Sequence, residues 1–174
     1  EASKPYSPTL IKKPSMINGQ IARVSGPEGK TVYVDSQGRI KIRFYWDHRK
    51  NSDKDSSCWI RVSELLAGNK WGTKFTPQVG TEVWVDFIDA DPDQPIVLRQ
   101  AHNALYPTTY PSKNTAINAI RSPNEEPLLP CNELRFDDSK DQESITITAQ
   151  RDLIHHAKNS IQTHIGGDDS HHID

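Results

Sequence analysis

The sequence contains very little cysteine or methionine. Its 174 residues include two cysteines, Cys58 and Cys131, and one methionine. Two cysteines are too few for the disulfide framework that stabilises many small secreted domains. Cys58 alternates with Ile60 and Val62, so we expect it to be a small core side chain rather than a metal ligand or a nucleophile.

Apolar residues are also scarce. They make up 34% of the chain, and the mean hydropathy is −0.73. No apolar run is long enough to cross a bilayer as a helix. This polar composition predicts that part of the chain buries its surface only against partners. The net charge of −2 gives no overall attraction to nucleic acid or to a membrane surface.

The sequence motifs of common enzyme classes are missing. The chain has no glycine-rich phosphate loop, no Gly-x-Ser-x-Gly elbow, no Cys-x-x-Cys pair and no His-Glu-x-x-His motif. Its acidic residues gather in stretches typical of turns, such as Asp89, Asp91 and Asp93. Catalytic carboxylates would have to face each other across a cleft. We therefore predict a protein that is not an enzyme and that holds no cofactor.

Residues 38–47 give the clearest strand signal. Their apolar side chains recur at every second position, which places them on one side of an extended strand. The apolar side consists of Ile40, Ile42, Phe44 and Trp46, and the other side, the basic stripe, consists of Arg39, Lys41, Arg43 and Tyr45. Residues 35–38 read as a turn, so residues 31–34 are expected to run back as an antiparallel hairpin partner.

Three further apolar runs supply neighbours for this strand, at residues 58–62, 83–88 and 95–99. With a first strand at 19–25 they amount to five or six short strands without a long helix. Close spacing of short strands is typical of a small antiparallel barrel, which we place at residues 19–101. Its predicted core residues are Ile40, Ile42, Phe44, Trp46, Ile60, Val83, Val85 and Phe87.

Three loops of this barrel carry their own expectations. Residues 47–57 are charged and rich in serine, so we expect them to be exposed and mobile. Residues 63–66 are expected to form one helical turn. Residues 68–80 hold Trp71 and Phe75 and are expected to form an ordered loop, because large aromatic side chains are rarely left in water.

The segments outside the barrel differ in character. Residues 1–18 contain prolines and lysines without periodicity, which predicts an extended connector. Residues 102–131 are rich in proline and asparagine, which predicts a linker or arm that is ordered only along another surface.

From residue 132 onward the sequence repeats with a period of eight. Ile145, Leu153 and Ile161 are eight residues apart, and even spacing keeps side chains on the same side of a strand. One or two apolar residues per octad cannot form a core within one chain. We therefore predict that copies wind together with these residues on a common axis. The predicted axial residues are Ile145, Ile147, Leu153, Ile161 and Ile165.

Histidines follow the same period. His156, His164 and His172 have the outward parity, whereas His155 and His171 share the inward parity of Leu153 and Ile161. Rings of histidines around an axis could hold a transition metal. Solvated or hydrogen-bonded histidines are the better explanation of the pattern, and we assign no metal to them.

Several blocks of the sequence occur together in a recognisable order. They lie at residues 26–29, 35–47, 57–63, 80–87, 91–96 and 132–137. In this order they resemble the valine-glycine repeat protein G (VgrG) family, the spike of type VI secretion systems. They are similar also to the central spike protein of contractile phage tails. The resemblance covers nearly the whole chain.

The resemblance implies an all-β chain, with an OB-type barrel followed by the start of an intertwined, trimeric β-helix (β-prism) at 132–174. It implies a homotrimer on a stacked tube-ring protein, in contact with baseplate components. It also implies that the trimer carries a C-terminal tip protein and effectors through a target membrane. Assembly in the bacterial cytoplasm and export into target cells are implied as well.

The alternative is an OB module that binds oligonucleotides or glycans, since the basic stripe is the kind of surface that tracks single strands. Pairing of the stripe with Glu82 and Asp86, which share the outward parity of the run at 83–88, would remove that surface. No nucleic-acid partner is expected.

Overall fold

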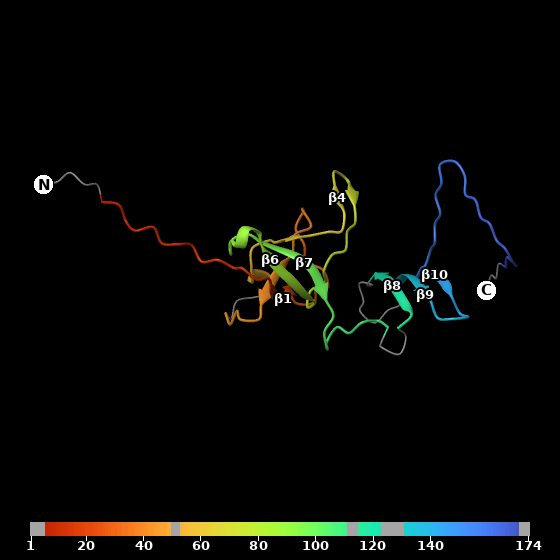
Figure 1. The fold of residues 1–174 in the computed structure, drawn as a ribbon, viewed down its shortest axis with the longest axis horizontal. Helices are drawn as coiled ribbons and strands as arrows, with labels where there is room; N and C mark the ends of the chain where they lie inside the picture. Colours follow the sequence, from red (N-terminus) through yellow and green to blue (C-terminus); the bar gives the residue numbers. More distant parts are fainter. Residues whose placement is uncertain (1–5, 50–52, 111–114, 123–130, 171–174) are drawn as a thin grey trace. The chain divides into compact units, whose positions relative to one another are not determined.

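A computed structural model describes residues 6–49, 53–110, 115–122 and 131–170 of the chain. These residues form two compact units, Glu1–Thr109 and Tyr110–Asp174, which we call the first and second unit and describe separately. The regular structure is β-strand with two short 3-10 turns (Figure 1). Within the described ranges, no helix is long and apolar enough to cross a membrane.

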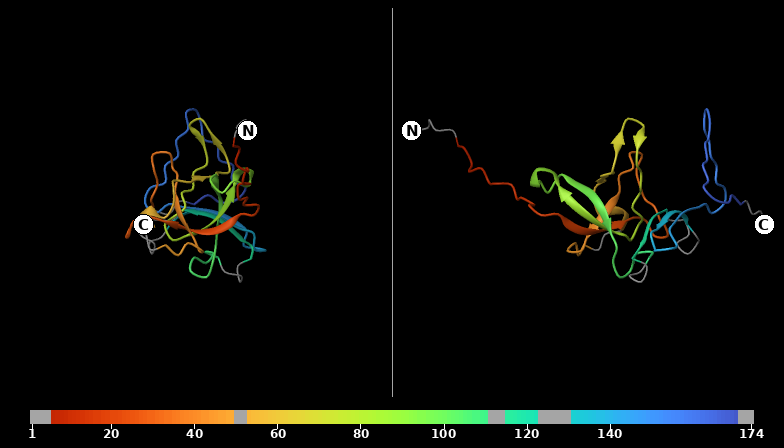
Figure 2. Two further views of the ribbon diagram at one scale, coloured as in Figure 1. Left: turned by 90° about the vertical axis from the view of Figure 1, so that its left-hand side faces the viewer. Right: turned by 45° about the vertical axis from the view of Figure 1, so that its right-hand side comes forward.

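The first unit is built around a curled five-stranded sheet, whose strand order is β2-β1-β6-β7-β3. Figures 1 and 2 show the curled sheet from different directions. Its strands are β1 (Gln20–Ser25), β2 (Lys41–Phe44), β3 (Arg61–Val62), β6 (Glu82–Phe87) and β7 (Pro95–Ala101). The 3-10 turns are η1 (Asp53–Asp55) and η2 (Ile88–Ala90). A separate two-stranded hairpin, β4 (Ala67–Gly68) with β5 (Trp71–Gly72), stands out from the sheet (Figure 2).

A backbone bridge closes the sheet into a barrel. The Ile40 N–H donates to the Ile60 carbonyl over 2.9 Å, and the Ile60 N–H donates back over 2.8 Å. This antiparallel bridge joins the two outer strands of the sheet, β2 and β3. An odd number of strands in a closed ring cannot alternate direction throughout. One pair must therefore be parallel, and that pair is β3 with β7, whereas the other ladders are antiparallel as predicted.

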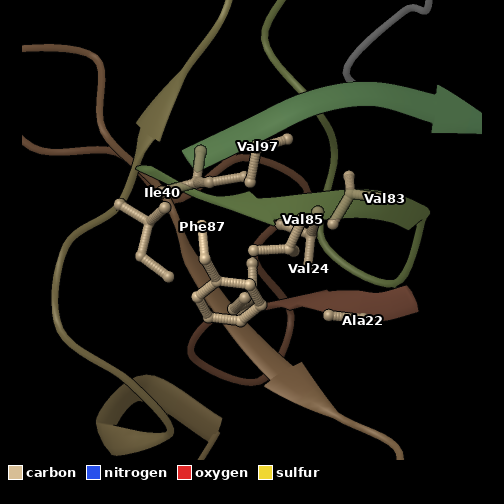
Figure 3. Packing of buried hydrophobic residues seen from close by; sticks show 9 residues of the cluster. Ala22, Val24, Ile40, Val83, Val85, Phe87 and Val97 are labelled. Carbon is tan, nitrogen blue, oxygen red and sulfur yellow. The ribbon is translucent and has the colours of Figure 1, made fainter. Parts of the chain in front are cut away.

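Alternation along each strand directs one set of side chains into the barrel. In β6, Val83, Val85 and Phe87 are buried while Trp84 points outward. Figure 3 shows these side chains packing against those of β1 and β7 and against Ile40. Phe44, Val34, Val62 and Met16 pack at the margin of the core. The buried apolar residues are Ala22, Val24, Ile40, Ile42, Ile60, Val83, Val85, Phe87 and Val97.

Trp46 is not a core residue, so that prediction is wrong. β2 ends at Phe44, and the Asp47 N–H closes a turn by donating to the Phe44 carbonyl over 3.0 Å. The alternation therefore stops before Trp46, whose side chain is 61% exposed. Its ring stacks on that of Phe44 with centroids 5.0 Å apart, and its Nε1 donates to Gln20 over 2.7 Å.

The predicted hairpin partner of this strand is also mostly wrong. The turn at 35–38 forms, with the Gly38 N–H donating to the Asp35 carbonyl over 3.1 Å and Gly38 at φ 73°. Residues 31–34, however, contribute a single bridge, between Val34 and Ile40. The full ladder partner of β2 is β1, because β1 continues the inward alternation that the barrel requires.

Two smaller expectations fail in the segment between β2 and β6, and the reason given for a third does not hold. Cys58 is exposed, because strand pairing begins only at Ile60 and leaves the preceding residues outside the sheet. Residues 63–66 form no helical turn and instead lead into β4. The aromatic residues of the 68–80 loop are not buried: Trp71 is 65% exposed and Phe75 is 50% exposed.

The second unit contains one antiparallel sheet with strand order β10-β9-β8. Its strands are β8 (Ile117–Ser122), β9 (Asn132–Asp137) and β10 (Ser144–Thr148). Residues 149–170 follow β10 without forming a strand in the single chain. The octad residues Leu153, Ile161 and Ile165 lie in this segment.

Candidate functional site

The basic stripe on the barrel is paired within its own unit. Arg39 Nε donates to Asp35 Oδ2 over 2.7 Å, and the Tyr45 hydroxyl donates to Glu82 over 3.0 Å. The Lys41 ammonium lies 5.2 Å from the centroid of the Trp59 ring, a cation–π distance. Burial opposes ionisation of Asp35, yet hydrogen bonds from the Arg39 side chain and backbone hold its pKa below the ordinary value.

Arg43, the remaining cation of the stripe, joins a network of ion pairs. Its Nε donates to Asp53 Oδ1 over 3.0 Å, and Arg23 donates to Asp53 Oδ2 over 3.2 Å. Asp47, whose side chain is 5% exposed, accepts two hydrogen bonds of 2.8 Å from Arg49. These bonds from Arg49 hold the pKa of Asp47 far below its usual range.

This network fixes both described ends of the 47–57 loop to the barrel. Asp47 and Asp53 are tied to arginines, and Ser56 is buried, with its hydroxyl in a short hydrogen bond to that of Ser25. The expectation of an exposed loop is therefore wrong for these residues. Outward parity predicts Glu82 and Asp86 as partners of the stripe, and Glu82 is one, through the Tyr45 hydroxyl. The partners of the arginines are Asp35, Asp47 and Asp53, which parity does not identify, although the four-residue spacing from Asp35 to Arg39 across the turn is a usable signal.

A surface that tracks single-stranded nucleic acid needs unpaired cations beside stacking aromatic rings. Here the cations of the basic stripe already face carboxylates or an aromatic ring of the same unit. The geometry of the stripe does not favour the oligonucleotide-binding alternative.

The sheet of the second unit has two unlike faces. The strand register places Ile120, Leu134 and Ile147 in one row across the three strands, with Phe136 opposite Ile145 in the next row. Cross-strand partners of this kind project from the same face of a sheet. Ile120, Ile145 and Ile147 are more than half exposed, so this apolar face is open in the single chain.

The opposite face of the same sheet is polar. Arg135 donates to the Thr146 hydroxyl over 3.4 Å, and the Tyr110 hydroxyl makes a short hydrogen bond to Glu133. The bond to Glu133 raises the pKa of Tyr110. These polar groups bond to one another, whereas Ile120, Ile145 and Ile147 of the apolar face are exposed.

The predicted axial residues share this exposure. Ile145, Ile147, Leu153, Ile161 and Ile165 are 48–70% exposed in the single chain. The register places Ile120, Leu134 and Phe136 on the same face of the sheet as Ile145 and Ile147. The alternation of Leu134 and Phe136 within β9 was a signal for them, whereas only the pairing with β9 places Ile120 beside them.

The octad histidines that the structure describes are His155, His156 and His164. Within the described residues, no group of three or more His, Cys, Asp and Glu side chains could hold a metal ion. His155, His156 and His164 are exposed. His171 and His172 lie outside the described residues.

Each of the two units contains a region that matches a known protein-family model. Residues 29–102 match the family model described as the type VI secretion system/phage-baseplate injector OB domain. Residues 121–174 match the model of the bacteriophage T4 gp5 C-terminal trimerisation domain. The chain belongs to the VgrG family of spike proteins. Its all-β architecture, an OB barrel followed by the start of a β-helix, agrees with both matches.

Several VgrG relatives align with most of the chain. It is 41% identical to the type VI secretion system spike protein VgrG4b of Pseudomonas aeruginosa, over 80% of this chain and 18% of that protein. VgrG1b of the same species is 34% identical over the whole chain and 24% of its own length. The actin cross-linking toxin VgrG1 of Vibrio cholerae is 38% identical over 81% of this chain and 13% of the toxin. The chain thus spans a quarter or less of these relatives.

Proposed function

We propose that this chain is a non-enzymatic, homotrimeric part of an injection spike that punctures a target envelope and carries effectors through it. The observation that carries the proposal is the open apolar face of β8–β9–β10, continued by exposed octad residues. In the proposed trimer, three such faces meet on one axis. Ile145, Ile147, Leu153, Ile161 and Ile165 are the axial residues, as the octad spacing predicts.

The energetics favour this arrangement. Burying one leucine or isoleucine side chain stabilises by roughly 1.5–3 kcal/mol. Three-fold symmetry repeats each such burial in every copy. Among the described strands, β8 and β10 each pair with β9 alone, and closed cyclic symmetry lets the outer edges of neighbouring chains pair. A rod of this kind is suited to transmitting force along its axis.

The proposed division of labour follows the chain. Residues 1–18 are an extended connector and residues 19–101 form the barrel. Residues 102–131 are an arm, and residues 132–174 form the start of the β-helix. Partners would be a stacked tube-ring protein, baseplate components, a C-terminal tip protein and effectors. Assembly would take place in the bacterial cytoplasm before export. No catalytic motif lies in the sequence, and the part shared with the actin cross-linking toxin is 13% of that protein.

The mass of the particle in solution tests the proposal. Size exclusion coupled to light scattering should give three times 19.6 kDa. Leu153→Asp would bring three carboxylates to the axis, and severe loss of trimer is expected. Thr146→Asp is the matched control, because its side chain would lie beside Arg135 on the polar face. A monomer at micromolar concentration, or equal behaviour of the two variants, would refute the proposal.

A further inference from the structure

The most exposed cluster of large apolar side chains on the barrel surrounds the β4–β5 hairpin. Leu65, Leu66, Trp71 and Phe75 are each at least half exposed. Leu66, Trp71 and Phe75 line a groove of about 490 Å³ between the hairpin and the 36–39 turn. Soluble surfaces seldom carry so many large apolar groups together unless something binds there.

Trp71 is held in one orientation on this hairpin. A Cβ atom added at Gly68 would lie 2.1 Å from the Trp71 ring, so the indole crosses directly over the glycine. The Thr73 N–H donates to the Leu66 carbonyl over 2.9 Å and secures the base of the hairpin. Exposed tryptophans fixed in this way are typical of the anchor positions at which interfaces concentrate their binding energy.

The charged side chains of the groove that form no ion pair with a described residue include two cations. Arg61 and Lys74 line it and are exposed, and neither forms an ion pair with any described residue. Glu64 is the acidic residue of the lining, and its carboxylate accepts hydrogen bonds from the Thr73 hydroxyl and the Phe75 N–H, at 3.3 and 3.1 Å. The groove therefore presents available positive charge beside apolar anchors.

We propose that this groove binds an extended, acidic polypeptide segment with large apolar side chains. Its carboxylates would pair with Arg61 and Lys74, and its apolar side chains would pack on Trp71 and Phe75. A polypeptide fits better than a nucleic acid, because Leu65 and Leu66 are aliphatic and offer no aromatic ring on which a base could stack. β4 and β5 form a sheet of two strands, so each also has an edge to which an extended segment can add.

Fluorescence anisotropy with defined probes tests this inference on the full chain. The probe is a labelled eight-residue peptide of alternating glutamate and leucine, and a lysine–leucine peptide and an eight-nucleotide deoxythymidine strand are compared with it. The acidic peptide should bind most tightly. Trp71→Ala and Gly68→Ala should each weaken its binding at least tenfold, while Trp84→Ala, an exposed tryptophan outside the groove, should not. Arg61→Glu combined with Lys74→Glu should reverse the preference between the two peptides.

Four binding results would overturn the inference. They are absence of acidic-peptide binding up to millimolar concentration, equal binding of both peptides, tighter binding of the deoxythymidine strand, or binding that survives Trp71→Ala. Light scattering is measured on every variant. A fall in mass on Trp71→Ala would show that a second copy of the chain occupies the groove, which also contradicts the inference. A native chain that is monomeric yet binds the acidic peptide would count against the trimer proposal alone.

Discussion

Ile40 and Ile60 bond to each other through both of their backbone N–H groups, at 2.9 and 2.8 Å, and so close the barrel between β2 and β3. Both side chains are buried at this seam. Ile40→Ala would leave a cavity where two outer strands meet, and we expect a loss of about 2–5 kcal/mol in the free energy of unfolding. Denaturant unfolding followed by tryptophan fluorescence reports on this unit, because all four tryptophans belong to it.

The control for this prediction is Val32→Ala. Val32 is 45% exposed, and a surface change of this kind is expected to stay within about 0.5 kcal/mol. Equal losses for the two variants would contradict the role of the Ile40–Ile60 seam in barrel stability.

Acid should destabilise the first unit through its paired aspartates. The pKa values of Asp35, Asp47 and Asp91 all lie below the ordinary 3.8. A lowered pKa means that these groups stabilise the folded state at neutral pH, and that the gain is lost as the pH falls through the folded-state values. The melting temperature should therefore be nearly flat from about pH 7 to 5 and should decline below about pH 4.

Asp47→Asn removes one of these groups. The variant should have a lower melting temperature at pH 7, because Arg49 and Arg43 lose their carboxylate partner. On acidification its melting temperature should fall by less than that of the native chain. Asp89→Asn is the control: Asp89 is exposed at φ 53°, a conformation that asparagine also adopts readily. Parallel acid profiles for Asp47→Asn and the native chain would rule out the network as a source of pH dependence.

Adjacent residues of β8 should differ in their effect on assembly. Ile120 lies on the apolar face of the sheet, opposite Leu134, whereas Ala119 lies opposite Arg135 on the polar face. Ile120→Asp is expected to reduce the trimer fraction strongly in light scattering, and Ala119→Asp is expected to leave it nearly unchanged. The prediction fails if the Ala119 variant is the more damaging of the two.

The Cys58 thiol should react readily in the folded protein, because Cys58 is exposed. In a Cys131→Ser variant, a disulfide reagent should modify the remaining thiol nearly as fast in buffer as in denaturant. Cys58→Ser should leave the melting temperature unchanged, since the side chain fills no space in the core. If the thiol reacts more than a hundredfold more slowly in the folded protein than in denaturant, Cys58 is buried, as its spacing from Ile60 suggests, and the prediction is wrong.

The difference between prediction and structure at Trp46 and Cys58 has a single cause. Both have the same parity as true core residues, Ile42 and Ile60, and parity is all that a period of two can report. Parity carries over only while the strand continues. A turn follows Phe44, and strand pairing begins only at Ile60, so parity no longer predicts burial at Trp46 or Cys58. Where each strand begins and ends depends on the extent of the neighbouring strand.

Local sequence pattern is enough to predict the inward residues of β2 and β6, the glycine turn at Gly38 and the eight-residue period of the apolar side chains. These follow from backbone sterics and from hydrophobic alternation over a few residues. The folded chain is needed to see which strands pair, that β3 runs parallel to β7, and that Asp53 rather than Glu82 binds Arg43. Those outcomes depend on closing one ring of strands and on which charges arrive within hydrogen-bond distance, and no local pattern encodes either.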